Sequence, residues 1–179
     1  MQKWSRRDAL WLGASALASG CGYALAGRGN SLPASIVSIG VPMFVNQSTT
    51  PEVDRVLTEA VRAELQTRRR YRIVPDATGV DALLIGRVLN VVLQPSGFTE
   101  QNQVARNLII ATASIEFRDM QADRLLWSNP SFQARDEFEV TTGTTANDPT
   151  ALFTQDANAL DRLARGFARS VVTSIFEAF

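Results

Sequence analysis

The sequence predicts an α+β domain in which two helices pack on one face of a mainly antiparallel sheet of four to five strands, of β-α-β-β-β-α type. Two patterns carry this prediction. In two segments apolar residues recur every three or four positions, the period of an amphipathic helix. In the segments before and between them, apolar residues alternate with a period of two, as in strands. Apolar stripes of both kinds must be buried, and packing the helices on the sheet buries them together.

The first half of the domain supplies one strand, one helix and a short strand. Alternating apolar residues predict a strand over Ile36–Val45. Thr50 followed by Pro51 is typical of an N-cap and a first helical position, and the helical stripe continues to about Arg69. A short strand over Tyr71–Val74 follows, which Pro75 ends.

The second half supplies three long strands and a final helix. The predicted ranges are 81–94, 104–119 and 125–136 for the strands, with a polar loop over 137–147 and a helix that begins at Asp148–Pro149. The first of these strands is apolar on both faces. Leu83, Ile85, Leu89 and Val91 form its second stripe, which predicts either a contact with a partner or a cover supplied by the final helix.

Composition excludes several classes of protein. The 179 residues carry 18 basic and 18 acidic side chains, one Cys and no His. This length suits one domain with a sizeable core. The chain cannot build a zinc or iron site from His and Cys ligands, a His-based catalytic triad or an internal disulfide. A neutral chain is also not typical of nucleic-acid binders. We therefore expect no metal, no cofactor and no nucleic-acid partner.

The N-terminus has the layout of a lipoprotein export signal. Residues 1–20 contain a positive segment with Lys3, a short apolar segment over 9–18 and a run of small residues that leads to Cys21. Cys21 is thus the predicted lipid-attachment site, and the alternative is a buried structural Cys after an ordinary signal peptide. Arg6–Arg7 also resembles a twin-arginine motif. We expect a signal peptide over 1–20, a Gly- and Ser-rich lipidated tether over 21–35 and a single domain over 36–179.

The charged clusters do not indicate catalysis. Asp136, Glu137 and Glu139 lack the spacing of a calcium loop and are interpreted as a solvated strand end. The arginines of 68–72 follow the first helix, where cations complement the helix dipole; contact with lipid phosphates is the alternative, and we favour the helix-dipole interpretation. No catalytic constellation is present in the sequence, so we predict that the protein is not an enzyme.

An ordered series of segments resembles the LptE family of lipopolysaccharide-assembly lipoproteins. The segments that carry the resemblance are Gly20–Leu25, Val41–Asn46, Leu57–Leu65, Asp81–Val88, Leu126–Trp127 and Ile175–Phe179. They cover nearly the whole chain after the signal peptide. The resemblance implies an outer-membrane lipoprotein, facing the periplasm, with an LptE-like α/β sandwich domain.

Membership of this family would imply a function in assembly. The chain would plug and help to assemble the LptD β-barrel, its partner, and assist delivery of lipopolysaccharide to the outer leaflet. The alternative is a lipoprotein subunit of another envelope assembly or secretion machine with the same fold. A third and more distant hypothesis is a hydrolase that works through carboxylates.

Two arginines are candidates for direct contact with lipopolysaccharide. Arg87 and Arg106 lie on or beside the two long central strands, each close to apolar residues. Guanidinium groups bind phosphates in a forked geometry, and nearby apolar surface would suit acyl chains. We favour the alternative, in which both arginines form surface salt bridges with strand acids such as Glu116.

Overall fold

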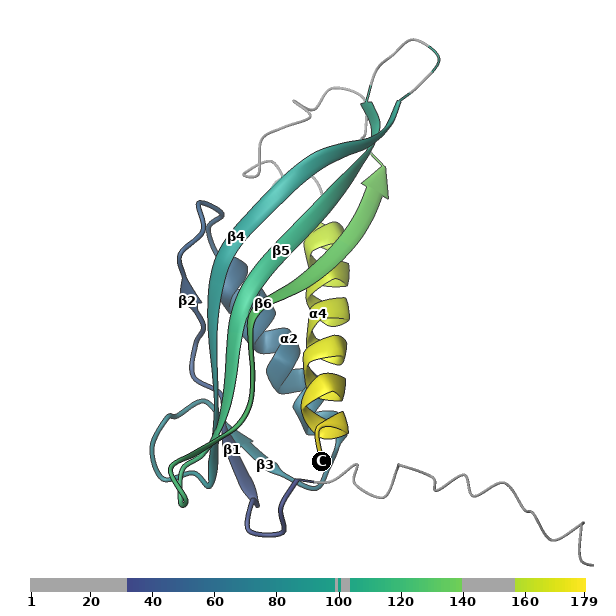
Figure 1. The fold of residues 1–179 in the computed structure, drawn as a ribbon. Helices are drawn as coiled ribbons and strands as arrows, with labels where there is room; N and C mark the ends of the chain where they lie inside the picture. Colours follow the sequence, from purple (N-terminus) through teal and green to yellow (C-terminus); the bar gives the residue numbers. More distant parts are fainter. Residues whose placement is uncertain (1–31, 99, 101–103, 140–156) are drawn as a thin grey trace, which may run out of the picture.

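The computed structural model describes residues 32–98, 100, 104–139 and 157–179. One long, twisted sheet forms one layer and two helices form the other (Figure 1). The predicted signal peptide, Cys21, most of the predicted tether and the start of the final helix lie outside the described residues. So does all of the predicted loop after Glu139.

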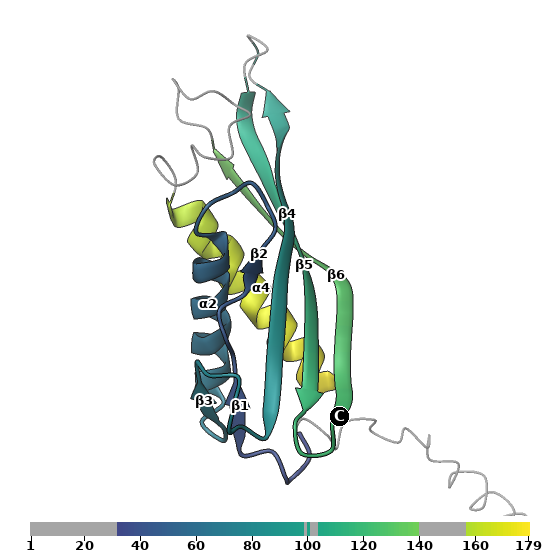
Figure 2. The same ribbon diagram turned by 90° about the vertical axis from the view of Figure 1, so that its left-hand side faces the viewer.

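Both helices cover the same face of the sheet. Helix α2 (Val53–Thr67) and helix α4 (Ala157–Glu177) lie side by side, and no helix of the described residues lies on the opposite face (Figure 2). The helical stripes meet the sheet in one apolar core, whose largest fully buried side chains include Leu57, Leu65, Leu84, Ile109, Ile115, Phe117, Leu163 and Phe167. The predicted α+β architecture with two helices on one face is confirmed. The alternative in which the final helix covers the second stripe of the long strand is wrong for Leu83 and Ile85, which lie on the face opposite the helices.

Three long strands form an antiparallel meander. Strand β4 (Ala82–Phe98) pairs with β5 (Val104–Asp119), which pairs with β6 (Arg124–Glu139). The alternation along β5 is regular from Asn107 to Asp119, with every second residue buried under the helices. All three strands were predicted, with bounds that differ by a few residues.

The rest of the sheet is parallel, which the sequence did not indicate. Strands β1 (Ser38–Gly40), β2 (Val45–Asn46) and β3 (Arg72–Val74) complete a six-stranded sheet of order β3-β1-β4-β5-β6. β1 and β2 both pair with β4, at different points along it. The single strand expected over Ile36–Val45 is therefore two strands. Pro42, which has no N–H to donate to a ladder, lies between them.

A β-bulge in β4 changes which of its side chains face the helices. The pairing register with β5 shifts between Val88 and Asn90. Beyond the shift Val91 pairs with Ala111 and is 4% exposed, in the core under the helices. The prediction that Val91 shares a face with Leu83 and Ile85 is wrong, because one extra residue in a strand reverses the phase of everything after it.

The start of α2 also differs from the expectation. Thr50 is not the N-cap; that position is Glu52, which has φ 57° and makes no capping side-chain bond. The Asn46 side chain organises the preceding turn, since it accepts from Ser48 N–H and donates to the Thr50 carbonyl. This turn takes the place of the predicted cap.

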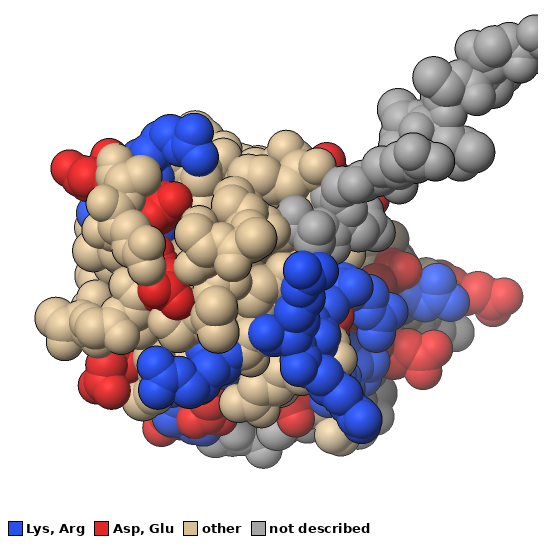
Figure 3. Space-filling view, turned by 90° about the horizontal axis from the view of Figure 1, so that it is seen from below, with Lys and Arg blue, Asp and Glu red and all other residues tan. Residues whose placement is uncertain are grey.

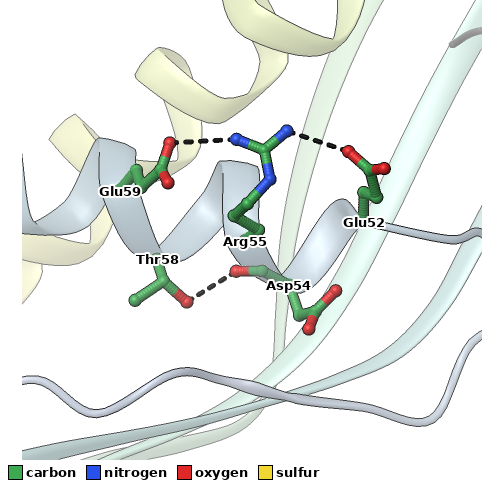
Figure 4. Close-up of polar contacts among 5 residues, drawn as sticks. All are labelled: Glu52, Asp54, Arg55, Thr58 and Glu59. Carbon is green, nitrogen blue, oxygen red and sulfur yellow. Dashed lines mark hydrogen bonds and ion pairs between the residues drawn. The ribbon is translucent and has the colours of Figure 1, made fainter.

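Polar contacts hold the first turns of α2 (Figure 4). Arg55 lies between Glu52 and Glu59, with nitrogen–oxygen distances of 2.9 and 3.2 Å. The hydrogen bond that Arg55 donates to Glu52 and the charge of Glu59 raise the pKa of Arg55 above its ordinary value. On the buried side, Thr58 Oγ1 donates to the Asp54 carbonyl and accepts from Phe44 N–H. This hydroxyl therefore ties the helix to the chain just before β2.

Candidate interaction surface

The helix-free face of the sheet is the largest feature without a cover inside the described chain. Its side chains come from the alternate positions of β4, β5 and β6 that point away from the helices. They are Leu83, Ile85, Arg87, Asn90, Val92, Gln94, Arg106, Leu108, Ile110, Thr112, Ser114, Glu116, Arg118, Leu125, Ser128, Gln133, Arg135, Glu137 and Glu139. We call this set the outer face. The outer face contains both aliphatic and charged side chains. Leu83 is buried although it points away from the helices.

Arg87 lies near the middle of the outer face. Its guanidinium is 3.5 Å from the Glu116 carboxylate on β5, and its side chain is 45% exposed. The favoured alternative from the sequence, an ion pair with Glu116, is the contact that the structure contains. An exposed pair of this kind stabilises a fold by at most about 1 kcal/mol.

Arg106 lies far from Arg87. Arg87 pairs with Ser114 across the β4–β5 ladder, and Arg106 precedes Ser114 by eight residues. At about 3.4 Å per residue the two arginines are separated by roughly 27 Å along the strand. Arg106 is exposed and packs over Gly97, whose absent Cβ would lie 3.5 Å from the Cβ of Arg106. The structure therefore does not bring the two candidate residues to one site.

An apolar margin runs beside Arg87. Val45 in β2 pairs with Arg87, so its side chain lies on the same side of the sheet, and it is 52% exposed. Met43 and Leu89 are also exposed, at 49% and 37%. Large apolar side chains gathered at a sheet edge are typical of contact surfaces. The sequence pattern did not indicate Val45 and Met43 as surface residues, because both lie within the single strand expected over Ile36–Val45.

A shallow pocket opens between β5 and β6. Its volume is about 240 Å³, and its lining includes Ser114, Glu116, Leu125, Ser128 and Pro130. The β5–β6 register shifts beside it, between Ala113 and Ile115. A proline in a strand pattern indicates an edge or a bulge, so Pro130 is the sequence signal that could have located this irregularity. The pocket borders the Arg87–Glu116 pair through Glu116.

The acidic side chains at the end of β6 do not point to one common site. Asp136 points to the helix side, where its carboxylate is 3.0 Å from Arg162 of α4. Glu137 points to the outer face and accepts from the Ser96 hydroxyl. Within the described residues no group of three or more His, Cys, Asp or Glu side chains is placed to hold a metal ion.

None of the described helices is long and apolar enough to cross a bilayer. The lipid attachment predicted at Cys21 concerns residues outside those the structure describes, and it stays a prediction.

Solved structures resemble the fold at low sequence identity. The hypothetical protein CT253 from Chlamydia trachomatis superposes with a TM-score of 0.51 at 8% identity, covering 78% of this chain and 98% of that one. A putative lipoprotein from Caulobacter crescentus gives a TM-score of 0.47 at 12% identity, covering 75% and 88%. PelC from Paraburkholderia phytofirmans, a dodecamer, gives 0.45 at 13% identity, covering 80% and 92%. The first of these likenesses supports the fold alone.

Family membership comes from sequence. No curated protein matches the chain. The profile of the family LptE, described as lipopolysaccharide-assembly, matches residues 36–175, which include α2, most of α4 and the six strands of the described residues. The resemblance drawn from the ordered segments is thereby confirmed, and the chain belongs to the LptE family of lipopolysaccharide-assembly proteins.

Proposed function

We propose that the mature chain is an outer-membrane lipoprotein, anchored through Cys21 and facing the periplasm, that plugs an LptD-type β-barrel and helps to assemble it. In this role it assists delivery of lipopolysaccharide to the outer leaflet and catalyses no reaction. The observation that carries the proposal is the match of the LptE family over residues 36–175.

The outer face and its apolar margin support a contact with such a barrel. Both helices cover the other face, so the barrel would meet Ile85 and Arg87 on the outer face and Val45 and Leu89 at the margin. The wall of a barrel lumen is lined by strands that present alternating side chains. A long sheet with mixed aliphatic and charged groups is complementary to that kind of surface.

A pull-down from envelope membranes in mild detergent tests the proposal. The expected result is an LptD-like barrel as the largest partner of the tagged chain. If the largest partner belongs to another envelope assembly or secretion machine, the barrel assignment is wrong. The variant Ile85→Glu with Leu89→Glu should stay folded and lose the barrel. A matched variant at an exposed site on the helix side, Arg165→Glu with Arg169→Glu, should retain it.

Contact with lipopolysaccharide is a separate part of the proposal. The separation of Arg87 and Arg106 means that the two cannot clasp one phosphate, so each would act alone. Binding of labelled lipopolysaccharide to the folded Arg87→Ala and Arg106→Ala variants, singly and together, tests them. Unchanged affinity in the double variant would remove both residues from any lipopolysaccharide site.

A further inference from the structure

Four arginines lie at the end of the domain where the described chain begins. Arg68, Arg69 and Arg70 follow the last turn of α2, and Arg72 begins β3; all four are exposed. We call them the arginine patch. Figure 3, which views this end directly, shows Lys and Arg side chains gathered there. Glu64 and Glu177 lie in the last turns of α2 and α4, and among the described residues neither makes an ion pair with the patch.

The patch is built on the same contacts that hold the first described residue. Leu32 is buried, and its N–H donates to the hydroxyl of Tyr71 at 3.2 Å. Tyr71 lies between Arg70 and Arg72 in the sequence, and its ring packs on Phe176 of α4 at 5.6 Å between centroids. Arg68 stacks over the same Phe176 ring at 5.3 Å. The contacts of Tyr71 and Phe176 therefore place Leu32 beside the arginine patch.

The distance to the predicted anchor restricts where a membrane can lie. Cys21 precedes Leu32 by 11 residues, and a fully extended chain of that length spans at most about 40 Å. Strand β4 alone has 17 residues, which at about 3.4 Å each corresponds to roughly 58 Å. A lipid on Cys21 therefore holds the bilayer nearer to the arginine patch than to the far end of the sheet.

We propose that the arginine patch docks on the anionic phospholipid headgroups of the leaflet that holds the anchor, and so keeps this end of the domain at that leaflet. The proposal rests on the lipidation included in the proposed function. Basic side chains close to an anionic leaflet each strengthen binding, within about a Debye length. Guanidinium groups suit this role because they pair with phosphates through two parallel hydrogen bonds.

A structural explanation of the patch makes a different prediction. Cations after α2 complement the negative end of the helix dipole, so their loss would lower the stability of the fold. Arg69 separates the two explanations because its φ is 49°, a left-handed conformation that favours Gly. Arg69→Gly should therefore not lower stability, yet it removes a charge from the patch.

The test measures binding of the full chain to vesicles in a Cys21→Ala background, so that no attached lipid contributes. Vesicles of phosphatidylglycerol mixed with phosphatidylcholine are compared with vesicles of phosphatidylcholine alone. Arg69→Gly with Arg70→Gln should bind the anionic vesicles about 30-fold more weakly. The control Arg165→Gln with Arg169→Gln, which removes the same charge from exposed positions of α4, should bind as the parent does.

Each result decides between the alternatives. Equal binding of the patch variant and the parent, or an equal loss in the control, overturns the proposal. The proposal is also overturned if the affinity of the parent for vesicles does not depend on lipid charge or on added salt. This measurement needs no variant. Intact mass of the unsubstituted chain is measured separately. An unmodified thiol would contradict the lipidation that the proposed function includes, and with it the anchor. If the chain is lipidated but the patch variant binds vesicles as the parent does, only the docking proposal is wrong.

Discussion

Ser38 and Asp81 are joined by backbone and side-chain hydrogen bonds, although 43 positions separate them in the sequence. Asp81 Oδ2 accepts from the Ser38 N–H and from the Ser38 hydroxyl, at 2.8 Å in both cases. The Asp81 N–H donates back to that hydroxyl at 3.0 Å, and Gln121 donates to the other carboxylate oxygen. The pair fastens β1 to the start of β4 and both to the β5–β6 turn.

This relationship makes stability depend on pH in a defined window. The hydrogen bonds from the Ser38 side chain and backbone, joined by that from Val37 N–H, lower the pKa of Asp81 from 3.8 to about 2. Because the pKa is lowered in the folded state, the stabilisation is full above about pH 4 and is lost as the pH falls toward 2. Asp81→Asn should lower the melting temperature at pH 7. The difference in melting temperature between this variant and the parent should disappear as the pH falls from about 4 toward 2.

Thermal unfolding followed by circular dichroism at several pH values checks this prediction. Asp76→Asn, at an exposed neighbouring position, is the matched control and should track the parent throughout. A gap that persists unchanged at pH 2 would show that the Asp81 carboxylate is not the source of the effect.

Gly86 is required by the ring that lies on it. A Cβ at this position would lie 2.6 Å from three ring atoms of Phe44, which is itself buried. Gly86→Ala should therefore destabilise the protein by about 1–3 kcal/mol, because the ring must leave its site. Gly166→Ala in α4 is the control, since a Cβ there meets nothing within 4 Å, and it should stabilise by about 0.5–1 kcal/mol. Denaturant unfolding measures both, and equal effects of the two substitutions would contradict the steric explanation.

The bulge in β4 predicts opposite results for two neighbouring apolar residues. Leu89→Glu places a charge at a site that is already 37% exposed, so the variant should fold. Val91→Glu buries an unpaired carboxylate under the helices, which should cost several kcal/mol and leave little folded protein. Expression, circular dichroism and melting temperature distinguish them. Similar behaviour of the two variants would mean that the register does not shift at Val88 and Asn90.

Lipidation of Cys21 predicts a change in fractionation. The thiol is the attachment point expected from the signal layout, and stable anchoring needs more than one acyl chain. Cys21→Ala should therefore move the protein from the membrane fraction to the soluble fraction while its fold is retained. Intact mass of the wild-type mature protein should exceed that of the unmodified chain; a mass that matches a free thiol would refute the assignment.

The sequence by itself determined the features that depend on local periodicity. The stripes of α2 and α4 and the alternation of β5 are visible residue by residue, because each element buries one side against the same core. The order of elements and the family follow from these features and from the ordered segments, without reference to any site geometry. The charged pair Arg87–Glu116 was also anticipated, since opposite charges on adjacent strands meet across the ladder.

Tertiary structure decided whatever depends on contacts between distant segments. Pairing across the ladder, rather than any local signal, places the bulge that turns Val91 inward. Parallel pairing of β2 with β4 brings Val45 beside Arg87, and only the packed helices bring Leu32, Tyr71 and Phe176 together beneath the arginine patch. A periodic pattern records which face of an element is buried, but not which other element buries it, because that choice is made by the core as a whole.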